Sequence, residues 1–488
     1  MSAVQNGIRK VVQKEAKEAL IYVVSNALIQ IGNLVVIPLF WSRLTPEDYG
    51  IIAITEIIGS FLSIFLGLSL DQSISKFYYE WPAEKRRRGI GAIWVVSWLS
   101  CLFIGTASIF VLSKTSRYIF DQVGFYPYIF LGLIAIVLTS LGQITFTTIR
   151  IKRLPWFYAA YSISTFVIYL VLRVVFVFVN REGLTGYYKA NIIGATIIAL
   201  FSVVLMLRFS KPCLRNSGLK QSLKFALPII PSSIITALTG ISDRLILQNY
   251  VSLSTLGIYS NSLIFASSIA KLHDAIKLSY GPFLWQTVNQ EKDSKSIIAK
   301  MAPFFVAPIF FLAFLVSIFM DDVIFLINIP SYFPVADLVP PVAGFTLIAC
   351  LYLYYSPGIM LGDRTDLLWI PSAARLLAVL SGFFLVPKFG IGGIIFSKYL
   401  AAVVFVVISF YLSQKVFPIP YRINKLIILS FFYIFCVATV FVISSETSFI
   451  SVLIKILVSF IYAATIGKIL GIKIHKLLSY IVPCRFNH

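Results

Sequence analysis

The chain alternates long apolar runs with short polar segments over almost its whole length. Most runs contain about 20 residues, the length that a helix needs to cross about 30 Å of hydrocarbon. The pattern predicts an all-α polytopic membrane protein with about 14 transmembrane helices. The predicted spans are 19–41, 50–70, 91–112, 127–148, 155–179, 187–208, 226–250, 256–280, 301–320, 339–361, 367–387, 391–412, 427–443 and 449–470.

The starts of the first six predicted spans recur about 207 residues later in the next six. Six crossings preserve orientation, so we expect two parallel six-helix repeats, a known transporter architecture, followed by a C-terminal helix pair. Residues 44–50 align with residues 251–257 in this register, and both segments end in glycine. The expected parts are a cytoplasmic N-terminal segment 1–18, an N-lobe 19–208, a cytoplasmic linker 209–225, a C-lobe 226–412, a final helix pair 427–470 and a cytoplasmic tail 471–488.

Composition excludes a soluble fold. Of the 488 residues, 59% are hydrophobic and 12% are charged, whereas globular proteins have about half and about a quarter. The five cysteines and three histidines are scattered along the chain without a paired spacing. We therefore expect neither a disulfide framework nor a metal site.

The basic residues predict the orientation in the membrane. With the N-terminus in the cytoplasm, 27 of the 41 Lys and Arg residues fall in cytoplasmic segments and five in the opposite loops. This bias predicts an inner-membrane protein with both termini in the cytoplasm. It also accounts for most of the net charge of +21, so we expect the loops to contact anionic lipid and not nucleic acid.

Nine further Lys and Arg residues fall inside the predicted spans, where each costs about 2.5–3.5 kcal/mol at a helix centre. Lys189, Lys277 and Lys468 lie near span ends, and we expect them to reach the interface. Arg375 lies near the middle of its span and is the strongest candidate for a functional cavity. The predicted substrate-binding set is Arg173, Arg244, Lys271, Arg375 and Lys398.

Acidic residues inside the spans are fewer, so a cavity built from these groups would be cationic and would select anions. The candidates for carrying a coupling proton or ion are Glu56, Asp243 and Asp274. Asp274 could instead neutralise Lys271 or Lys277, which lie three residues away on the same helix face. Asp243 and Arg244 point about 100° apart on a helix and are not automatically an ion pair.

Polar residues also form a stripe on the first predicted span. Asn26, Gln30 and Asn33 follow the i, i+4, i+7 pattern of one helix face. Such a stripe either joins helices by hydrogen bonds or lines a wet cavity. The sequence leaves both readings open.

Signatures of an enzyme are missing from the sequence. There is no GxxxxGK[ST] phosphate loop, no DxD pair and no histidine cluster. No predicted loop exceeds about 20 residues, which leaves no room for a soluble catalytic domain. We therefore expect a transporter without a cofactor, and not an enzyme.

Several short segments resemble the Wzx-type oligosaccharide flippases. The carriers of the resemblance are Pro38-Leu-Phe-Trp-Ser-Arg-Leu-Thr-Pro-Glu-Asp-Tyr-Gly50, Gly67-Leu-Ser-Leu-Asp71, Asp243-Arg244 and Leu256-Gly-Ile-Tyr259. These flippases belong to the multidrug/oligosaccharidyl-lipid/polysaccharide (MOP) exporter superfamily. The order of the segments and the predicted helix count fit that superfamily along the whole chain.

The resemblance implies translocation of an undecaprenyl-diphosphate-linked oligosaccharide from the cytoplasmic to the periplasmic leaflet, for O antigen, capsule or a related polymer. It also implies alternating access between two lobes, with membrane lipids and other polysaccharide-assembly membrane proteins as partners. The alternatives are a MATE-like multidrug exporter, a lipid II flippase, and a membrane-bound polysaccharide polymerase or glycosyltransferase. A cationic cavity disfavours the exporter of cationic drugs, because like charges repel.

Overall fold

The computed structural model describes residues 21–22, 24–214, 218–421, 423–443 and 449–470, and within these ranges it contains helices and no strand. Eleven of the described helices are long and apolar enough to cross a membrane, and Val24–Phe40 and Ile423–Thr439 form shorter apolar helices. Helix α11 (Leu253–Gln290) covers the predicted span 256–280 with a less apolar sequence. The all-α polytopic fold is therefore confirmed, while the exact number of 14 spans remains a prediction.

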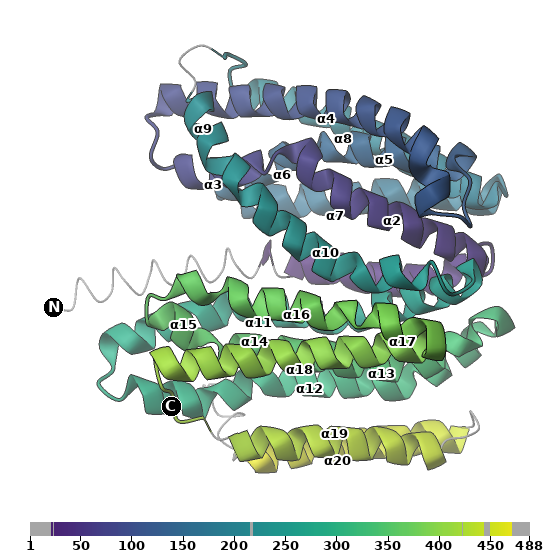
Figure 1. Cartoon of the computed structure of the whole chain (residues 1–488), viewed down its shortest axis with the longest axis vertical. Helices are drawn as coiled ribbons and strands as arrows, with labels where there is room; N and C mark the ends of the chain where they lie inside the picture. Colours follow the sequence, from purple (N-terminus) through teal and green to yellow (C-terminus); the bar gives the residue numbers. More distant parts are fainter. Residues whose placement is uncertain (1–20, 23, 215–217, 422, 444–448, 471–488) are drawn as a thin grey trace, which may run out of the picture. The chain divides into compact units, whose positions relative to one another are not determined.

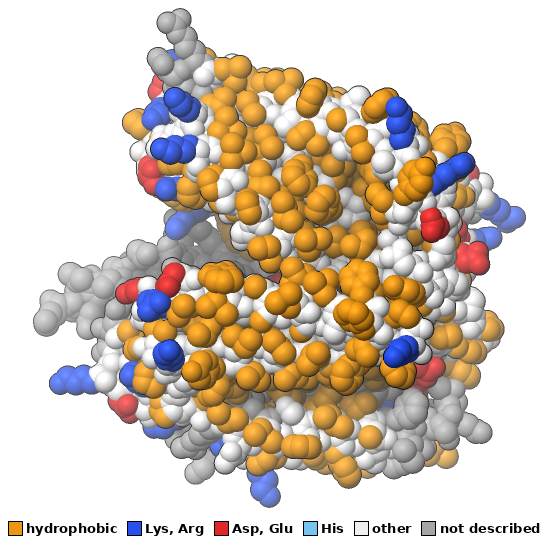
Figure 2. All heavy atoms as spheres, viewed as in Figure 1, with side chains coloured by type: hydrophobic (Ala, Val, Ile, Leu, Met, Phe, Trp, Pro, Cys, Tyr) orange, Lys and Arg blue, Asp and Glu red, His pale blue; other side chains and the backbone are white. Residues whose placement is uncertain are grey.

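Charges and apolar side chains are separated on the surface, as a lipid-embedded helical protein requires. Figure 2 shows hydrophobic side chains covering the sides of the helices, whereas Lys, Arg, Asp and Glu gather toward the helix ends. Large apolar groups such as Phe103 (78% exposed) and Phe384 (79% exposed) point outward. This distribution would be unfavourable in water and supports a multi-pass membrane protein.

The chain divides into two compact units, Met1–Ser260 with Val386–Ile391, and Asn261–Leu385 with Gly392–His488. In the first unit, α9 (Leu219–Ala226) begins within the predicted linker 209–225, and α10 (Ile230–Leu247) packs against α2 (Pro46–Gly67). Its elements, of which Figure 1 labels the α-helices, are α2 (Pro46–Gly67), α3 (Leu70–Phe77), α4 (Ala83–Ile119), η1 (Phe125–Ile129), α5 (Phe130–Ser140), α6 (Gln143–Ile151), α7 (Pro155–Arg173), η2 (Val174–Val179), α8 (Gly183–Phe209), α9 (Leu219–Ala226) and α10 (Ile230–Leu247).

The segment that carries the family resemblance is a helix start. Thr45 Oγ1 accepts a hydrogen bond from the Asp48 backbone nitrogen (3.2 Å), and Asp48 Oδ2 accepts one from the Thr45 nitrogen (2.8 Å). Pro46 occupies the first helical position, where its missing N–H costs nothing. This capping box fixes where α2 begins.

The second unit contains most of α11 and the helices that follow it. Within this unit α12 packs against α13, α19 and α20, and Phe314 of α12 stacks on Tyr462 of α20 at 4.2 Å between ring centroids. Aromatic packing therefore holds the C-terminal pair onto this unit. The elements are α12 (Ser294–Ile327), η4 (Pro330–Tyr332), α13 (Phe333–Cys350), α14 (Tyr352–Tyr355), α15 (Pro357–Leu361), η5 (Thr365–Leu367), α16 (Trp369–Leu380), α17 (Gly382–Phe389), α18 (Ile391–Val416), α19 (Ile423–Ile443) and α20 (Phe449–Leu470).

Several helices extend beyond the predicted spans. The segment 71–90, expected as a cytoplasmic connection, forms α3 and the first turns of α4. Helix α12 runs from Ser294 to Ile327 instead of 301–320. The extra turns contain charged residues, such as Asp321 and Asp322 of α12, so hydropathy alone did not assign them to helices.

Candidate functional site

Arg173 is held in a fixed position inside the first unit. It is the last residue of α7, directly before the π-helical turn η2. Its Nε and Nη2 atoms both donate to Oδ1 of Asn191 in α8, at 3.0 and 2.9 Å. Its guanidinium lies 4.7 Å from the ring centroid of Tyr187 and 5.7 Å from that of Tyr169. These contacts restrict the side chain to one orientation.

Arg173 lines a polar cleft of about 520 Å³. Glu56, one of the predicted coupling residues, lines the same cleft from α2. Because most of the lining carries hydroxyl, amide or aromatic groups, the cleft can bind a polar ligand by hydrogen bonds. The polar and aromatic lining residues are Thr55, Glu56, Ser60, Ser63, Thr139, Ser140, Gln143, Tyr169, Arg173, Tyr187, Tyr188 and Asn191.

A second cavity, of about 320 Å³, also has Arg173 in its wall. Asn26 and Asn33 from the predicted polar stripe line this cavity, together with Tyr158 and Ser162. The structure therefore favours the interpretation that these two asparagines line a wet cavity. Arg173 separates two polar spaces, which gives its guanidinium access to a ligand from more than one direction.

Glu56 forms an ion pair with Arg244, which joins α2 to α10. Arg244 Nη1 lies 2.8 Å from Glu56 Oε2, and the side chains are 16% and 55% exposed. Arg244 Nε is buried and has no hydrogen-bond partner among the described residues. The Arg244 guanidinium can therefore donate a further hydrogen bond. It lies next to the Glu56 carboxylate, which lines the Arg173 cleft.

Asp243 points away from this pair. It is 1% exposed, and its Oδ2 accepts a hydrogen bond from the hydroxyl of Tyr259 at 2.9 Å. Its Oδ1 accepts one from the backbone nitrogen of Arg244 at 2.9 Å. The side chains of Asp243 and Arg244 therefore serve different partners, as their helical spacing predicts.

The other three predicted cations belong to the second unit. Lys398 is 8% exposed and its Nζ lies 5.9 Å from the ring centroid of Phe345. Arg375, half-buried, places its guanidinium 5.1 Å from the ring centroid of Phe405. Each of these two cations thus lies beside an aromatic ring, whereas Lys271 is exposed.

Asp274 has a histidine as its near neighbour. Its Oδ1 lies 3.6 Å from Nδ1 of His273, and its side chain is 64% exposed. This contact is with His273, whereas the helical spacing also allowed Asp274 to neutralise Lys271 or Lys277. The role of Asp274 as an ion-coupling residue remains a prediction.

The sequence did not predict the ion pair between Lys455 and Asp322. Lys455 Nζ in α20 lies 2.7 Å from Asp322 Oδ2 in α12, and the side chains are 0% and 12% exposed. Lys455 is one of the nine Lys and Arg residues that fall inside the predicted spans, but the predicted span 301–320 ends before Asp322. An isolated buried lysine is itself a signal that a carboxylate partner exists.

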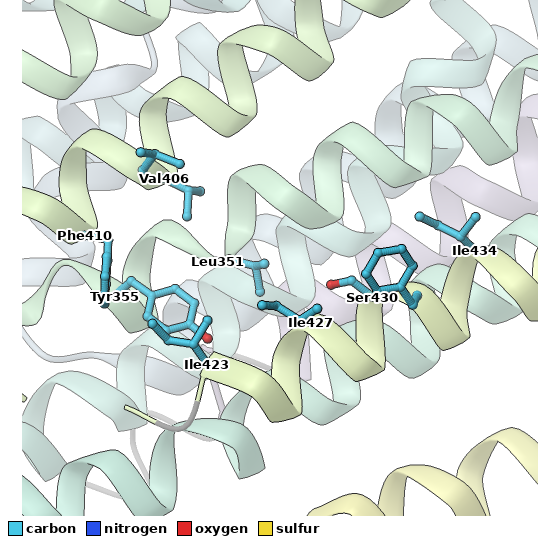
Figure 3. Close-up of a pocket in the computed structure, with 10 residues that line it drawn as sticks. Leu351, Tyr355, Val406, Phe410, Ile423, Ile427, Ser430 and Ile434 are labelled. Atoms are coloured by element: carbon cyan, nitrogen blue, oxygen red, sulfur yellow. The ribbon is translucent and has the colours of Figure 1, made fainter. Parts of the chain in front are cut away.

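An apolar groove of about 390 Å³ lies in the second unit, where α19 faces α14 and α18 (Figure 3). Its only polar groups are the hydroxyls of Tyr355 and Ser430. A groove of this composition suits a hydrocarbon chain. The lining residues are Leu351, Tyr355, Val406, Val407, Phe410, Ile423, Ile427, Ser430, Phe431 and Ile434.

In the described ranges, no group of three or more His, Cys, Asp or Glu residues is arranged to hold a metal ion. The polar groups of the Arg173 cleft are suited to binding by hydrogen bonds and charge.

Comparison with solved structures places this fold among transporters. The chain resembles the lipid II flippase MurJ in an inward closed conformation, with a TM-score of 0.69 and 15% identity over 92% of this chain and 99% of that chain. It also resembles an inward-facing MATE multidrug resistance transporter of the MOP superfamily (TM-score 0.57, 13% identity, 80% and 97% covered). The Vibrio cholerae MATE transporter VcmN in its bent form gives a TM-score of 0.52, 15% identity and 84% and 97% coverage.

Among curated proteins, none matches the chain by sequence. A family model described as "Polysaccharide biosynthesis protein" matches residues 42–326, more than half of the chain. This range contains Arg173, Glu56 and the Asp243–Arg244 pair. Because this family model covers more than half of the chain, the chain belongs to the polysaccharide biosynthesis protein family.

Proposed function

We propose that this protein is a flippase that moves an undecaprenyl-diphosphate-linked oligosaccharide from the cytoplasmic to the periplasmic leaflet of the bacterial inner membrane. It acts as a transporter without catalysis and without a cofactor. The observation that carries the proposal is the polar cleft around Arg173. The products served are O antigen, capsule or a related surface polysaccharide.

The chemistry of Arg173 suits a diphosphate. The Asn191 side chain accepts hydrogen bonds from two of the five N–H groups of the guanidinium. Counted over the described residues, three N–H donors therefore remain for a ligand. Arginine binds phosphate oxygens in a two-pronged geometry, and charge-assisted hydrogen bonds are stronger than neutral ones. A pre-positioned guanidinium also loses little conformational entropy on binding.

The rest of the cleft suits a sugar. Tyr169 and Tyr187 present aromatic faces beside Arg173, and Gln143 and Asn191 add amides. Sugar hydroxyls both donate and accept hydrogen bonds, as amide and hydroxyl side chains do. A ligand with an anionic end and a neutral polar end therefore matches this lining better than a cationic drug.

In the second unit, the half-buried Arg375 and the buried Lys398 provide further positive charge. Facing lipid, each would cost about 2.5–3.5 kcal/mol on insertion scales. Their retention beside Phe405 and Phe345 supports a role in binding the substrate, and we include Lys271 and Arg244 in the same set. The apolar groove at α19 would accept part of the polyprenyl tail.

The coupling ion is proposed to act through carboxylates of the first unit. Glu56 is bound to Arg244 and also lines the Arg173 cleft. Protonation of Glu56 or arrival of a cation would release Arg244 toward the diphosphate. Asp243 and Asp274 are the other candidates.

The test uses a deletion strain of the native host. Lipid extracts are examined by mass spectrometry and surface polysaccharide by gel, with complementation by the wild type and by Arg173→Gln. We expect complete lipid-linked units to accumulate and polymer to be lost in the deletion strain, with restoration by the wild type only. An incomplete sugar unit would point to an enzyme, and unchanged polymer with altered drug sensitivity would point to an exporter.

A further inference from the structure

Basic side chains converge at one end of the first unit, outside the Arg173 cleft. Arg86 and Arg87 lie in the first turn of α4, and Lys152 directly follows α6. Burial and the neighbouring charges of Arg87 and Arg86 lower the pKa of Lys152 below its usual value. Hydrogen bonds bring the segments that carry these cations together: the Lys211 nitrogen donates to the Arg87 carbonyl oxygen at 3.0 Å, and the Tyr79 hydroxyl donates to the Ile151 carbonyl oxygen at 3.0 Å.

Local contacts hold two of these cations in place. Arg86 Nη1 donates to the backbone oxygen of Tyr78 at 3.4 Å, and its guanidinium lies 4.7 Å from the Tyr78 ring centroid. Lys152 Nζ lies 3.8 Å from the ring centroid of Phe209, at the end of α8. Aromatic rings orient these charges but do not neutralise them.

The nearby carboxylate of Glu84 is already engaged elsewhere. Its Oε1 lies 3.1 Å from Arg88 Nη2 and 3.4 Å from Lys211 Nζ. Glu84 therefore does not neutralise Arg86, Arg87 and Lys152. Binding of an anion would stabilise this cluster of positive charges.

An aromatic anchor places this cluster at the level of lipid head groups. Trp156, four residues after Lys152, is 71% exposed in the first turn of α7. Exposed tryptophan next to Lys and Arg is typical of the membrane–water interface. The anion expected at this depth is the phosphate of a lipid.

An apolar groove of about 330 Å³ begins beside the cluster and runs between α7 and α8. Phe157 lines the groove, and its ring centroid lies 6.3 Å from that of Phe209, the residue beneath Lys152. Phe209 therefore connects the cluster of positive charges with the apolar groove. The lining residues are Phe157, Ala160, Tyr161, Ser164, Thr165, Ile168, Ile197, Ile198 and Phe201.

We propose that this end of the first unit is a binding site for an anionic glycerophospholipid. Arg86, Arg87 and Lys152 bind the phosphate and the anionic head group, and one acyl chain lies in the groove between α7 and α8. A zwitterionic lipid offers the same chain but carries a compensating positive charge, which these cations repel. The site is separate from the Arg173 cleft and is not part of the substrate path.

The test is native mass spectrometry of the full-length, delipidated protein in detergent with phosphatidylglycerol or phosphatidylcholine of identical chains. We expect tighter binding of phosphatidylglycerol. Arg86→Gln/Lys152→Gln should weaken its binding about thirtyfold, since each of the two interfacial cations contributes about 1 kcal/mol. The matched control, Lys292→Gln/Lys300→Gln, removes two charges from the second unit and should bind like the wild type.

A second variant tests the groove separately. Ala160→Trp fills the groove but keeps the cations, and it should weaken binding of phosphatidylglycerol without affecting binding of glycerol phosphate. Equal binding of the two phospholipids, or an Arg86→Gln/Lys152→Gln variant that behaves like its control, overturns the proposal. Displacement of phosphatidylglycerol by equimolar undecaprenyl diphosphate also overturns it, because the site would then belong to the substrate.

Discussion

Gly50 of α2 and Gly257 of α11 lie at a crossing of two backbones within the first unit. A β-carbon on Gly257 would lie 2.8 Å from the backbone nitrogen of Gly50 and would collide with the carbonyl oxygen of Pro46. A β-carbon on Gly50 would collide with the carbonyl oxygen of Leu253. These two glycines end the two segments that the sequence register aligns, so the repeat positions meet each other in space.

Gly257→Ala should therefore destabilise the protein. Inserting a methyl group into a packed crossing costs about 1–3 kcal/mol, and here the obstacles are backbone atoms that cannot rotate away. Thermal unfolding in detergent, followed by size-exclusion chromatography, measures the effect. The control is Gly240→Ala in α10, where a β-carbon meets nothing within 4 Å; equal melting temperatures for the two variants would contradict the argument.

Arg173→Lys should transport less than the wild type, and Arg173→Gln should lose transport. Lysine retains the charge but not the planar fork that binds Asn191 and phosphate together, so we expect at least a tenfold loss for glutamine and a smaller one for lysine. Surface polymer and lipid-linked intermediates in the complemented deletion strain report the result. Lys189→Gln, which removes an ion pair with Glu182 at the start of α8, should retain transport.

Arg244→Gln/Arg375→Gln should abolish polymer export while leaving the protein in the membrane. These residues are buried or half-buried cations of the two units, and both belong to the proposed anion-binding set. Membrane abundance by immunoblot and surface polymer by gel are measured together. Normal export in this double variant would refute the cationic-cavity hypothesis.

Lys455→Met should destabilise the second unit by about 3–5 kcal/mol, because Asp322 would remain buried without its partner. Lys455→Met/Asp322→Leu removes both charges and should recover most of the loss. A double-mutant cycle on melting temperature separates the pair from its parts. If the double variant melted no higher than Lys455→Met, the buried pair would not be the cause.

Ile427→Trp should impair transport if the groove at α19 accepts the polyprenyl tail. Ile427 lines the groove, whereas its neighbour Ile428, similarly exposed at 52% against 48%, does not. Ile428→Trp is therefore a matched control on the same helix. Equal transport by the two tryptophan variants, at equal membrane abundance, would exclude the groove from the transport path.

The comparison of sequence and structure can be made residue by residue. Hydropathy determined that the chain is helical and lies in a membrane, because about 20 apolar residues in a row have few alternatives to a transmembrane helix. It also identified Arg173, Arg244, Arg375 and Lys398 as costly charges. The turns that extend α4 and α12 contain charged residues, so hydropathy did not assign them to helices and missed Asp322.

The tertiary structure alone decided which side chains from different helices interact. The spacing of Asp243 and Arg244 predicted that they diverge, but only packing chose Tyr259 for one and Glu56 for the other. Asn191 and the tyrosines around Arg173 carry no unusual sequence signal, since polar and aromatic residues are common in such helices. The sequence thus determined which charges need partners, because burial in lipid is costly, and the three-dimensional packing of the helices decided which partners they received.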